Sequence, residues 1–427
     1  MEHPLEPILH PSSVAVVGVS ADPRKRGHQA MRALLESGYA GAVYPVHPKG
    51  GTHFGRVAAR TVLEIDAVPD HALVCTPAAG VLAVLERCAQ KGVRGAVVLA
   101  AGVPGLSEEG APLDSGIREI ARRTGLRVVG PNTSGILRPS IGLNLVGARG
   151  VPPGRLAILA QSGNVALAVM NEAVAKTGLG VSLYIGVGNE ADLAFHEYLD
   201  YLETDSETGA VVMYVEGLRE GRAFLETARR VGRTKPLVVL KGGRSPVGGA
   251  AVRTHTGALA GSAAVFRAAM RQAGVIEVRR SDELFQVCRA LAEQPSLSPE
   301  GGVAVLSDGG GHAILAADAL AEAGVPLADL SAETRARLRD LLGRAAAVGN
   351  PLDLAGAGDR DPGIFARAHE ALLGDPAVGA VVVVGLFGGY AIRFDPELAG
   401  AEIRAAETMA AQAAAHRKAW VVHSLYA

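Results

Sequence analysis

The chain has 427 residues, of which 48% are hydrophobic, only 4% are aromatic and 54 are glycine. Its 42 basic and 43 acidic residues give a formal net charge of −1, which argues against a nucleic-acid surface or a membrane-surface helix. The length allows about two to four domains, and the mixture of Val, Ala, Leu and Gly is typical of α/β layers joined by tight turns.

The cysteines and the N-terminus indicate a soluble, cytoplasmic protein. Cys75, Cys88 and Cys288 are far apart, show no metal-binding spacing and are typical of small core residues in a reducing compartment. The first residues, MEHPLEPILHPSS, lack the basic region and apolar run of a signal peptide. The longest apolar run, 378–392, carries four glycines and is shorter than the roughly 20 residues that a membrane span needs.

The first segment, 1–150, has the pattern of a Rossmann-like domain with a parallel sheet. Residues 14–19, VAVVGV, form a continuous apolar run, as expected for a strand covered by helices on both faces. Similar runs and amphipathic stretches alternate after it. The expected strands are 42–46, 71–75, 95–100 and 127–129, and the expected helices are 28–37, 79–91 and 113–124.

The loops at the strand ends of this segment suggest a groove for an extended, phosphate-bearing ligand. The loop after the first strand, GVSADPRKRG, is not the dinucleotide fingerprint G-x-G-x-x-G. It nevertheless brings three basic residues, 24–26, to a helix N-terminus, which is an anion site in principle and otherwise a solvated turn. Gly, Pro and small polar residues also follow the later strands, in HPK at 47–49, CTPAAG at 75–80, AAGVPG at 100–105 and GPNTSG at 130–135.

Two flavodoxin-like, doubly wound domains are expected after the linkers at 151–154 and 295–299, at 151–297 and 298–427. Their starts, RLAILAQSG at 155–163 and GVAVLSDGG at 302–310, have the same form. The expected strands are 155–160, 181–185, 210–215, 237–240, 303–306, 380–384 and 419–423, and the expected helices are 165–176, 191–203, 223–231, 262–272 and 312–323. The sequence stops just after a strand, which leaves open a fragment of a longer chain or a short last domain.

The glycine-rich stretch 241–261 is expected to be a loop that presents His255 at a strand-to-helix junction, a common catalytic layout. A connector with an incidental histidine fits the spacing equally well. If this junction neighbours the one at Ser162 and Gly163, two helix N-termini converge and favour a phosphoryl group, which an imidazole can carry covalently. Glu216, at the end of a strand, is placed to orient the ring, or it is simply a surface acid. Glu190 and Asp192 are expected to cap the following helix.

Several motifs resemble one family over nearly the whole chain. The most specific is THTGALAG at 254–261, preceded by LKGGRS at 240–245. The others are GPNTSG at 130–135, AQSGN at 160–164, YVEG at 214–217, GNEADL at 188–193, HPK at 47–49 and VGNPLDL at 348–354. With these motifs the chain resembles the NDP-forming acyl-CoA synthetases, relatives of the α subunit of succinyl-CoA synthetase.

The resemblance implies a phosphohistidine at His255 that exchanges its phosphoryl group with an acyl phosphate, from which coenzyme A forms acyl-CoA. It implies phosphohistidine support from Glu216, Ser162, Gly163, Thr256 and Gly257. It implies coenzyme A contacts from Gly18, Ser20, Gly27, Lys49, Cys75, Thr76, Pro77, Ala101, Gly102 and Asn132. No ATP-grasp sequence is present, so ATP or ADP with Mg²⁺ is expected on a partner subunit or a further domain, in a homo- or hetero-oligomer. No metal-ligating residues are expected in this chain.

Three departures from the family's motifs leave the acyl group open: Thr133 stands where cysteine is usual, AQSG replaces SQSG, and Glu190 replaces a lysine. The alternative function is a non-catalytic one, a CoA-binding regulatory subunit or the CoA-sensing part of an acetyltransferase fusion. The intact THTGALAG motif favours the enzyme, because a pure binding protein has no need of that histidine.

Overall fold

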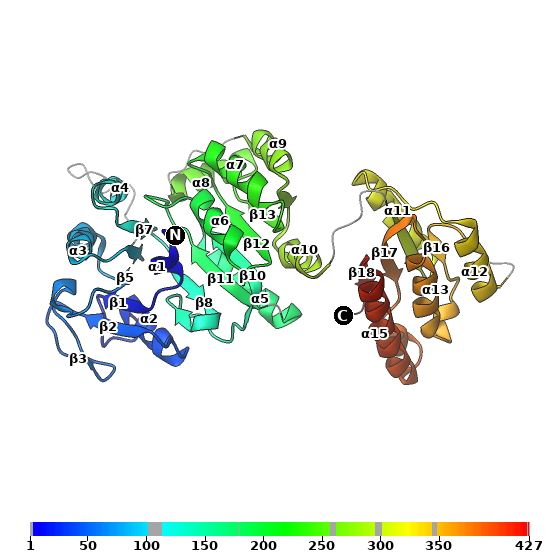
Figure 1. The fold of residues 1–427 in the computed structure, drawn as a ribbon, viewed down its shortest axis with the longest axis horizontal. Helices are drawn as coiled ribbons and strands as arrows, with labels where there is room; N and C mark the ends of the chain where they lie inside the picture. Colours follow the sequence, from blue (N-terminus) through cyan, green and yellow to red (C-terminus); the bar gives the residue numbers. More distant parts are fainter. Residues whose placement is uncertain are drawn as a thin grey trace. The chain divides into compact units, whose positions relative to one another are not determined.

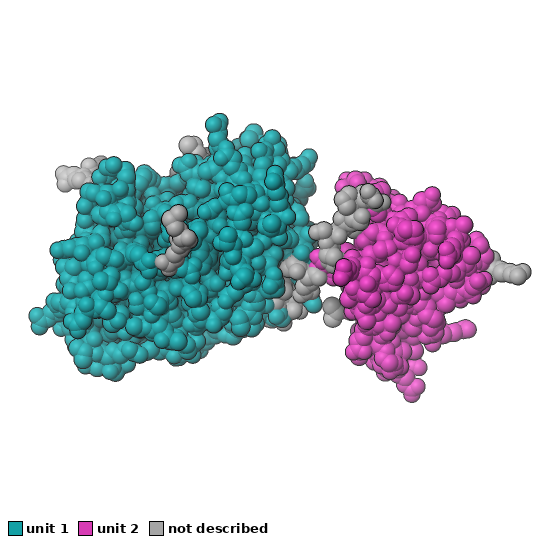
Figure 2. Space-filling model, viewed as in Figure 1, with its two compact units in different colours: residues 1–292 teal, residues 293–427 magenta. Residues whose placement is uncertain are grey.

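The computed structural model describes residues 3–100, 113–178, 180–256, 262–294, 301–343, 348–424 and 426. The chain divides into two compact units, residues 1–292 and 293–427, which are coloured separately in Figure 2. Within the described residues, every helix is too short or too polar to cross a membrane.

The first sheet of unit 1 is parallel throughout, as the sequence predicts, with the strand order β2-β1-β5-β6-β7. Its strands are β1 (Ser13–Val17), β2 (Ala42–Val46), β5 (His71–Val74), β6 (Gly95–Val98) and β7 (Arg127–Val129). The continuous apolar runs are buried on both faces, because helices cover both sides of the sheet (Figure 1). The order places the carboxyl ends of β1, β2 and β5 side by side.

The helices around this sheet are α1 (Glu6–Leu9), α2 (Arg26–Glu36), α3 (Ala78–Lys91) and α4 (Leu113–Thr124). Helix α3 shows why these segments are helical. Its buried residues Val81, Leu85 and Cys88 follow at intervals of four and three, which gives one apolar stripe toward the sheet. A small hairpin, β3 (Thr52–His53) and β4 (Arg56–Val57), and a 3₁₀ turn, η1 (Val62–Glu64), follow β2.

The second sheet of unit 1 has the order β14-β13-β12-β10-β11-β8-β9. Its strands are β8 (Ile136–Arg138), β9 (Leu143–Asn144), β10 (Pro153–Ala160), β11 (Val181–Gly186), β12 (Ala210–Val215), β13 (Leu237–Lys241) and β14 (Ile276–Val278). The antiparallel strands β8 and β9 lie before the predicted division at residue 150 yet extend this sheet, and β10 begins inside the predicted linker. Strands of two or three residues are too short to show a period in the sequence.

The helices of the second sheet are α5 (Gly163–Thr177), α6 (Phe195–Thr204), α7 (Gly221–Val231), α8 (Pro246–Thr256), α9 (Ala263–Ala273) and α10 (Ser281–Glu293). Helix α8 corrects the prediction of a continuous loop over 241–261. It begins where the Ser245 hydroxyl accepts a hydrogen bond from the Gly248 N–H at 3.0 Å, with a proline at the first helical position. That Ser-Pro pair is a helix start signal, and the glycines after it conceal it.

One hydrophobic core joins the two sheets of unit 1. It includes Leu5 and Met31 from the helices around the first sheet. It also includes Leu183, Phe195 and Val239 from the second sheet and its helices, and all five residues are less than 2% exposed. Because this core is continuous, the two predicted domains form a single compact unit.

Unit 2 is a separate doubly wound domain with the parallel order β16-β15-β17-β18. Its strands are β15 (Gly302–Ser307), β16 (Leu352–Asp353), β17 (Val378–Gly385) and β18 (Ala419–Ser424). Its helices are α11 (Gly310–Glu322), α12 (Ala332–Leu342), α13 (Gly363–Leu373), α14 (Tyr390–Arg393) and α15 (Ala399–His416). Its own core, which includes Phe365, Leu372 and Met409, explains why it forms a second unit.

Candidate functional site

The carboxyl edge of the second sheet brings together the ends of three parallel strands in the order β13-β12-β10. Ser162 follows β10, Glu216 follows β12 and Lys241 ends β13. The sequence analysis left open whether the junctions after β10 and β13 are neighbours. Strand β12 lies between them, so Glu216 occupies the middle of this edge.

Gln161 holds the ends of β10 and β12 together. Its Oε1 accepts hydrogen bonds from the backbone N–H groups of Glu216 at 2.5 Å and Gly217 at 3.0 Å, and its Nε2 donates to the carbonyl of Gly217 at 2.8 Å. Both ends of this amide are therefore used to fix the backbone beside Glu216. Sequence reasoning missed the role of Gln161, because these bonds form only where the ends of β10 and β12 meet.

Glu216 is buried, with 5% of its surface exposed, and Lys241 is buried to the same extent. The Lys241 ammonium donates to the carbonyl of Glu216 at 2.8 Å, and burial lowers its pKa while the Glu216 charge opposes that shift. Burial, and next the charge of Glu216, raises the pKa of the neighbouring Tyr214. The acid at the centre of the edge thus has a cation beside it in a place that water hardly reaches.

Ser162 and Gly163 form the N-terminus of α5. The Ser162 hydroxyl caps the helix by accepting from the Val165 N–H at 3.5 Å. A Cβ on Gly163 would lie 2.6 Å from the Cβ of Ser134, so only glycine allows the helix to start this close to the 130–135 loop. The free N–H groups and the dipole of this turn favour an anion at the edge.

His255 and Thr256 lie in the last turn of α8, not on a loop. Their side chains are outside the described part of the structure, and so is the whole of Gly257. The contact between the His255 imidazole and Glu216 therefore stays a prediction.

The 130–135 loop connects the carboxyl ends of the two sheets. The Thr133 hydroxyl donates to the carbonyl of Gly186, and the N–H groups of Asn189 and Ala191 donate to the carbonyls of Pro131 at 2.9 Å and Gly130 at 3.0 Å. The N–H of the exposed Asn132 donates to the carbonyl of Ala100 at 2.8 Å. A ligand reaching from the first sheet can therefore meet the edge that carries Ser162 and Glu216.

The expected helix caps are wrong. Helix α6 begins at Phe195, and Glu197 caps it by accepting from the Ala194 N–H at 3.0 Å. Asp192 accepts from the Val128 N–H at 2.8 Å and pairs with Arg127, so it ties the 188–193 loop to β7. Glu190 is 3% exposed with a positive φ of 55°, and burial raises its pKa to about 8.

The carboxyl ends of β1, β2 and β5 form a cradle in the first sheet. A Cβ on Gly27 would lie 2.1 Å from the carbonyl oxygen of Gly18, and Gly18 itself has a φ of +91° beside the backbone of Cys75 and Thr76. An adjacent cavity of about 110 Å³ is lined by Gly18, Val46, Pro48, Arg60 and Thr76 with their neighbours. The Thr76 hydroxyl is buried and has no hydrogen-bond partner among the described residues, so the cradle fits a ligand that brings a polar group.

The remaining predicted coenzyme A contacts surround this cradle or lie outside the described residues. Ser20 accepts from the Asp22 N–H at 3.1 Å, Lys49 is exposed after β2, and Pro77 precedes α3. Burial raises the pKa of the Cys75 thiol to about 12, which favours the protonated thiol at neutral pH. Ala101 and Gly102 fall outside the described residues.

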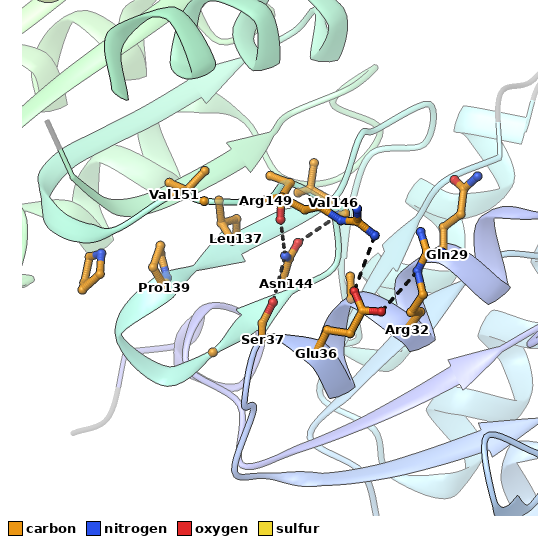
Figure 3. A pocket seen from close by; sticks show the side chains of 16 residues that line it. Gln29, Arg32, Glu36, Ser37, Leu137, Pro139, Asn144, Val146, Arg149 and Val151 are labelled. Carbon is orange, nitrogen blue, oxygen red and sulfur yellow. Dashed lines mark hydrogen bonds and ion pairs between the residues drawn. The ribbon is translucent and has the colours of Figure 1, made fainter. Parts of the chain in front are cut away.

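A larger cavity of about 470 Å³ lies between α2 and the β8–β9 hairpin (Figure 3). Its charged groups are matched, because Glu36 lies 3.7 Å from both Arg32 and Arg149. Asn144 donates to Ser37 at 3.0 Å and to the carbonyl of Ala148 at 2.7 Å. This cavity offers a ligand few unused polar groups.

No described cluster of three or more His, Cys, Asp or Glu residues is arranged to hold a metal ion.

Two family models match unit 1, one over the first sheet and one over most of the second. Residues 12–139 match the CoA binding domain, and residues 153–291 match the succinyl-CoA ligase like flavodoxin domain. Among solved structures, the dinucleotide forming acetyl-coenzyme A synthetase 1 of Ca. Korarchaeum cryptofilum, in complex with phosphate and ADP, aligns with a TM-score of 0.87. It is 31% identical, over 98% of this chain and 88% of that one.

The curated relatives agree with that structure. The ADP-forming acetate–CoA ligase I subunit alpha of Pyrococcus furiosus is 38% identical over 83% of this chain and 77% of its own length. The corresponding II subunit alpha of the same organism is 36% identical over 90% of this chain and 84% of its own. The ADP-forming acetate–CoA ligase I of Archaeoglobus fulgidus is 38% identical, and this chain spans 54% of its length. With a CoA binding domain, a succinyl-CoA ligase like domain and these relatives, the chain belongs to the family of ADP-forming acetate–CoA ligase α subunits.

Proposed function

We propose that the chain is the coenzyme A-binding and phosphohistidine-bearing component of an ADP-forming acid–CoA ligase. The overall reaction interconverts a carboxylic acid, coenzyme A and ATP with acyl-CoA, ADP and phosphate. The names of the relatives and the CoA binding domain support this reaction. The observation that carries the proposal is the shared edge, where the N-terminus of α5 and the buried Glu216 lie beside the loop from the first sheet.

The proposed phosphoryl carrier is His255. Its imidazole attacks the terminal phosphorus of ATP and releases ADP, and a carboxylate oxygen of the acid then attacks the phosphorus and releases the imidazole. The thiolate of coenzyme A attacks the acyl carbon of the resulting acyl phosphate and expels inorganic phosphate. We assign the support of the phosphoryl group to Ser162, Gly163, Thr256 and Gly257.

Glu216 is proposed to orient the phosphorylated ring. A carboxylate that accepts the second ring N–H fixes the tautomer and stabilises the cationic form of the imidazole. Gln161 and Lys241 fix the backbone of Glu216, so the position of this residue does not depend on the histidine.

Coenzyme A is proposed to bind along the first sheet, from the cradle at Gly18, Gly27 and Thr76 toward Asn132. Ser20, Lys49, Cys75, Pro77, Ala101 and Gly102 complete the predicted contacts. The close approach at Gly27 and the unused hydroxyl of Thr76 support the cradle as the nucleotide end of this groove.

ATP and Mg²⁺ are proposed to bind to an ATP-grasp partner subunit or a further domain. Two of the relatives are named as alpha subunits, which supports a partner subunit and a hetero-oligomer. The location that we propose is the cytoplasm. Acetate is the first acid to test, because it is the acid in those names.

The decisive experiment is incubation of the chain with ATP labelled in its γ-phosphoryl group, Mg²⁺ and the partner. Wild-type protein and the control His312→Ala, changed in unit 2, are expected to take up an acid-labile label, and His255→Ala is not. A label that survives His255→Ala contradicts the phosphohistidine. Absence of any label from wild type, together with tight binding of coenzyme A, supports the regulatory subunit instead.

A further inference from the structure

A second charged pocket lies at the β13–β14 side of the same sheet. Its volume is about 630 Å³, and it is lined by Lys241, Gly243, Arg244, Ser245, Gly248, Arg267 and Arg279. Four of these seven residues are cationic and none is acidic. Ser162 follows β10, which lies two strands from β13 in the sheet. Adjacent strands are about 4.8 Å apart, so the pocket is about 10 Å from the α5 anion site along the sheet.

The cations of this pocket are only partly neutralised. Arg267 pairs with Glu277 at 3.2 Å, and Lys241 faces the charge of Glu216. Arg244 and Arg279 differ, because within the described residues no ion pair joins either guanidinium to an acid. Arg244 instead donates to the backbone carbonyl of Arg279 at 2.8 Å, which holds its side chain across the pocket.

The backbone of the pocket keeps the space open. Gly243 has a φ of +70°, and a Cβ there would lie 2.8 Å from the side chain of Val252, so the turn before α8 requires glycine. Ser245 caps the first turn of α8, whose partial positive charge adds to the four side chains. A guanidinium fork with free N–H groups suits the several oxygens of a phosphate better than it suits a monoatomic anion, which offers a single acceptor.

We propose that Lys241, Arg244, Arg267 and Arg279 form a second anion site that binds a phosphate group, from inorganic phosphate or from the terminal phosphate of a nucleoside diphosphate. The site borders the edge at Ser162 and Glu216, with which it shares Lys241, and it does not depend on phosphorylation of His255. It gives the protein a place to hold a phosphate-bearing substrate or product next to the helix that carries His255.

Calorimetric titration of the full chain with inorganic phosphate tests the proposal. The double variant R244Q/R279Q is expected to weaken binding at least about tenfold, because it removes two guanidinium groups that can donate charge-assisted hydrogen bonds to the phosphate. The matched control is Arg280→Gln, which removes the adjacent arginine whose side chain pairs with Asp282. It is expected to bind phosphate as wild type does.

The titration is repeated in a His255→Ala background, so that binding at the proposed phosphohistidine does not contribute. A second arm uses ADP. If ADP binds more tightly than phosphate and R244Q/R279Q loses that binding, the nucleotide is the source of the phosphate group. If the affinity for ADP is the same in wild type and in R244Q/R279Q, the source is inorganic phosphate. Absence of phosphate and ADP binding at millimolar concentration overturns the proposal. So does equal affinity in wild type and R244Q/R279Q, or an equal loss in the Arg280→Gln control.

Discussion

Glu216 combines burial with a fixed backbone, and both properties bear on its proposed role. The carbonyl of the residue accepts from Lys241 at 2.8 Å, and its N–H donates to Gln161 at 2.5 Å. These bonds fix the backbone of Glu216, and burial limits the space around its side chain, so the base of the carboxylate is positioned without help from the substrate.

We therefore expect Glu216→Gln to slow phosphorylation of the chain by about 10²–10⁴-fold, because the amide keeps the shape but loses the charge that stabilises the cationic ring. The rate is measured by rapid quench with labelled ATP and the partner. The matched control is Glu220→Gln, an exposed acid four residues later, which should leave the rate unchanged. A wild-type rate in Glu216→Gln would exclude Glu216 from the reaction.

His71 makes the first sheet sensitive to acid. It lies in β5 with none of its surface exposed, and burial lowers its pKa from 6.5 to about 4. In the unfolded chain, His71 therefore takes up a proton below pH 6.5. In the folded chain it stays neutral until the pH falls to about 4. The free energy of unfolding is therefore unaffected by His71 above pH 6.5. As the pH falls, protonation of His71 in the unfolded chain lowers it, by about 3 kcal/mol at pH 4.

The expected result is a steeper loss of unfolding free energy between pH 6.5 and 4 in wild type than in His71→Leu, which has no titrating group. Urea denaturation at a series of pH values measures it. His10→Leu, a change at an exposed histidine, serves as the control and should keep the wild-type slope. Equal slopes in wild type and His71→Leu would show that other groups govern the acid response.

At the scale of elements, the start of α5 is fixed by its contact with the 130–135 loop. A Cβ on Gly163 would lie 2.6 Å from the Cβ and 2.9 Å from the Oγ of Ser134. We expect Gly163→Ala to destabilise unit 1 by about 1–3 kcal/mol and to weaken the anion site, because the helix must move away from the loop.

The second variant Ser134→Gly removes the two clashing atoms, so the pair Gly163→Ala/Ser134→Gly is expected to recover part of the loss. Thermal unfolding and labelling with ATP measure both effects. Gly221→Ala, at the start of α7 with open space around it, is the control and should be close to neutral. Failure of Ser134→Gly to improve Gly163→Ala would place the strain elsewhere.

The same elements show what the sequence predicts well. Strands such as VAVVGV are recognisable because parallel strands are buried on both faces, and the small polar turns after them correctly place Ser162 and Glu216 at a carboxyl edge. Helix α8 was missed because its glycines hide a Ser-Pro start, and β8 and β9 because two or three residues show no period. Gln161 was missed because its two-sided hydrogen bonding exists only once β10 and β12 are neighbours.

At the scale of the whole molecule, the two units have separate hydrophobic cores, and the proposed coenzyme A groove belongs to unit 1 alone. Separate cores favour separate unfolding transitions in a scanning calorimeter. A ligand that binds only one unit stabilises that unit by RT ln(1 + [L]/Kd), about 2.7 kcal/mol at a hundredfold excess over Kd.

Coenzyme A is therefore expected to raise the melting temperature of one transition by a few degrees and to leave the other in place, which serves as an internal reference. Gly27→Ala should abolish the shift, because a Cβ 2.1 Å from the Gly18 carbonyl disrupts the cradle. Gly221→Ala, at the start of α7 beside the second sheet, meets nothing within 4 Å and should keep it. A shift of both transitions would mean that coenzyme A contacts both units or couples their unfolding, and a shift of neither would remove the cradle from the coenzyme A site.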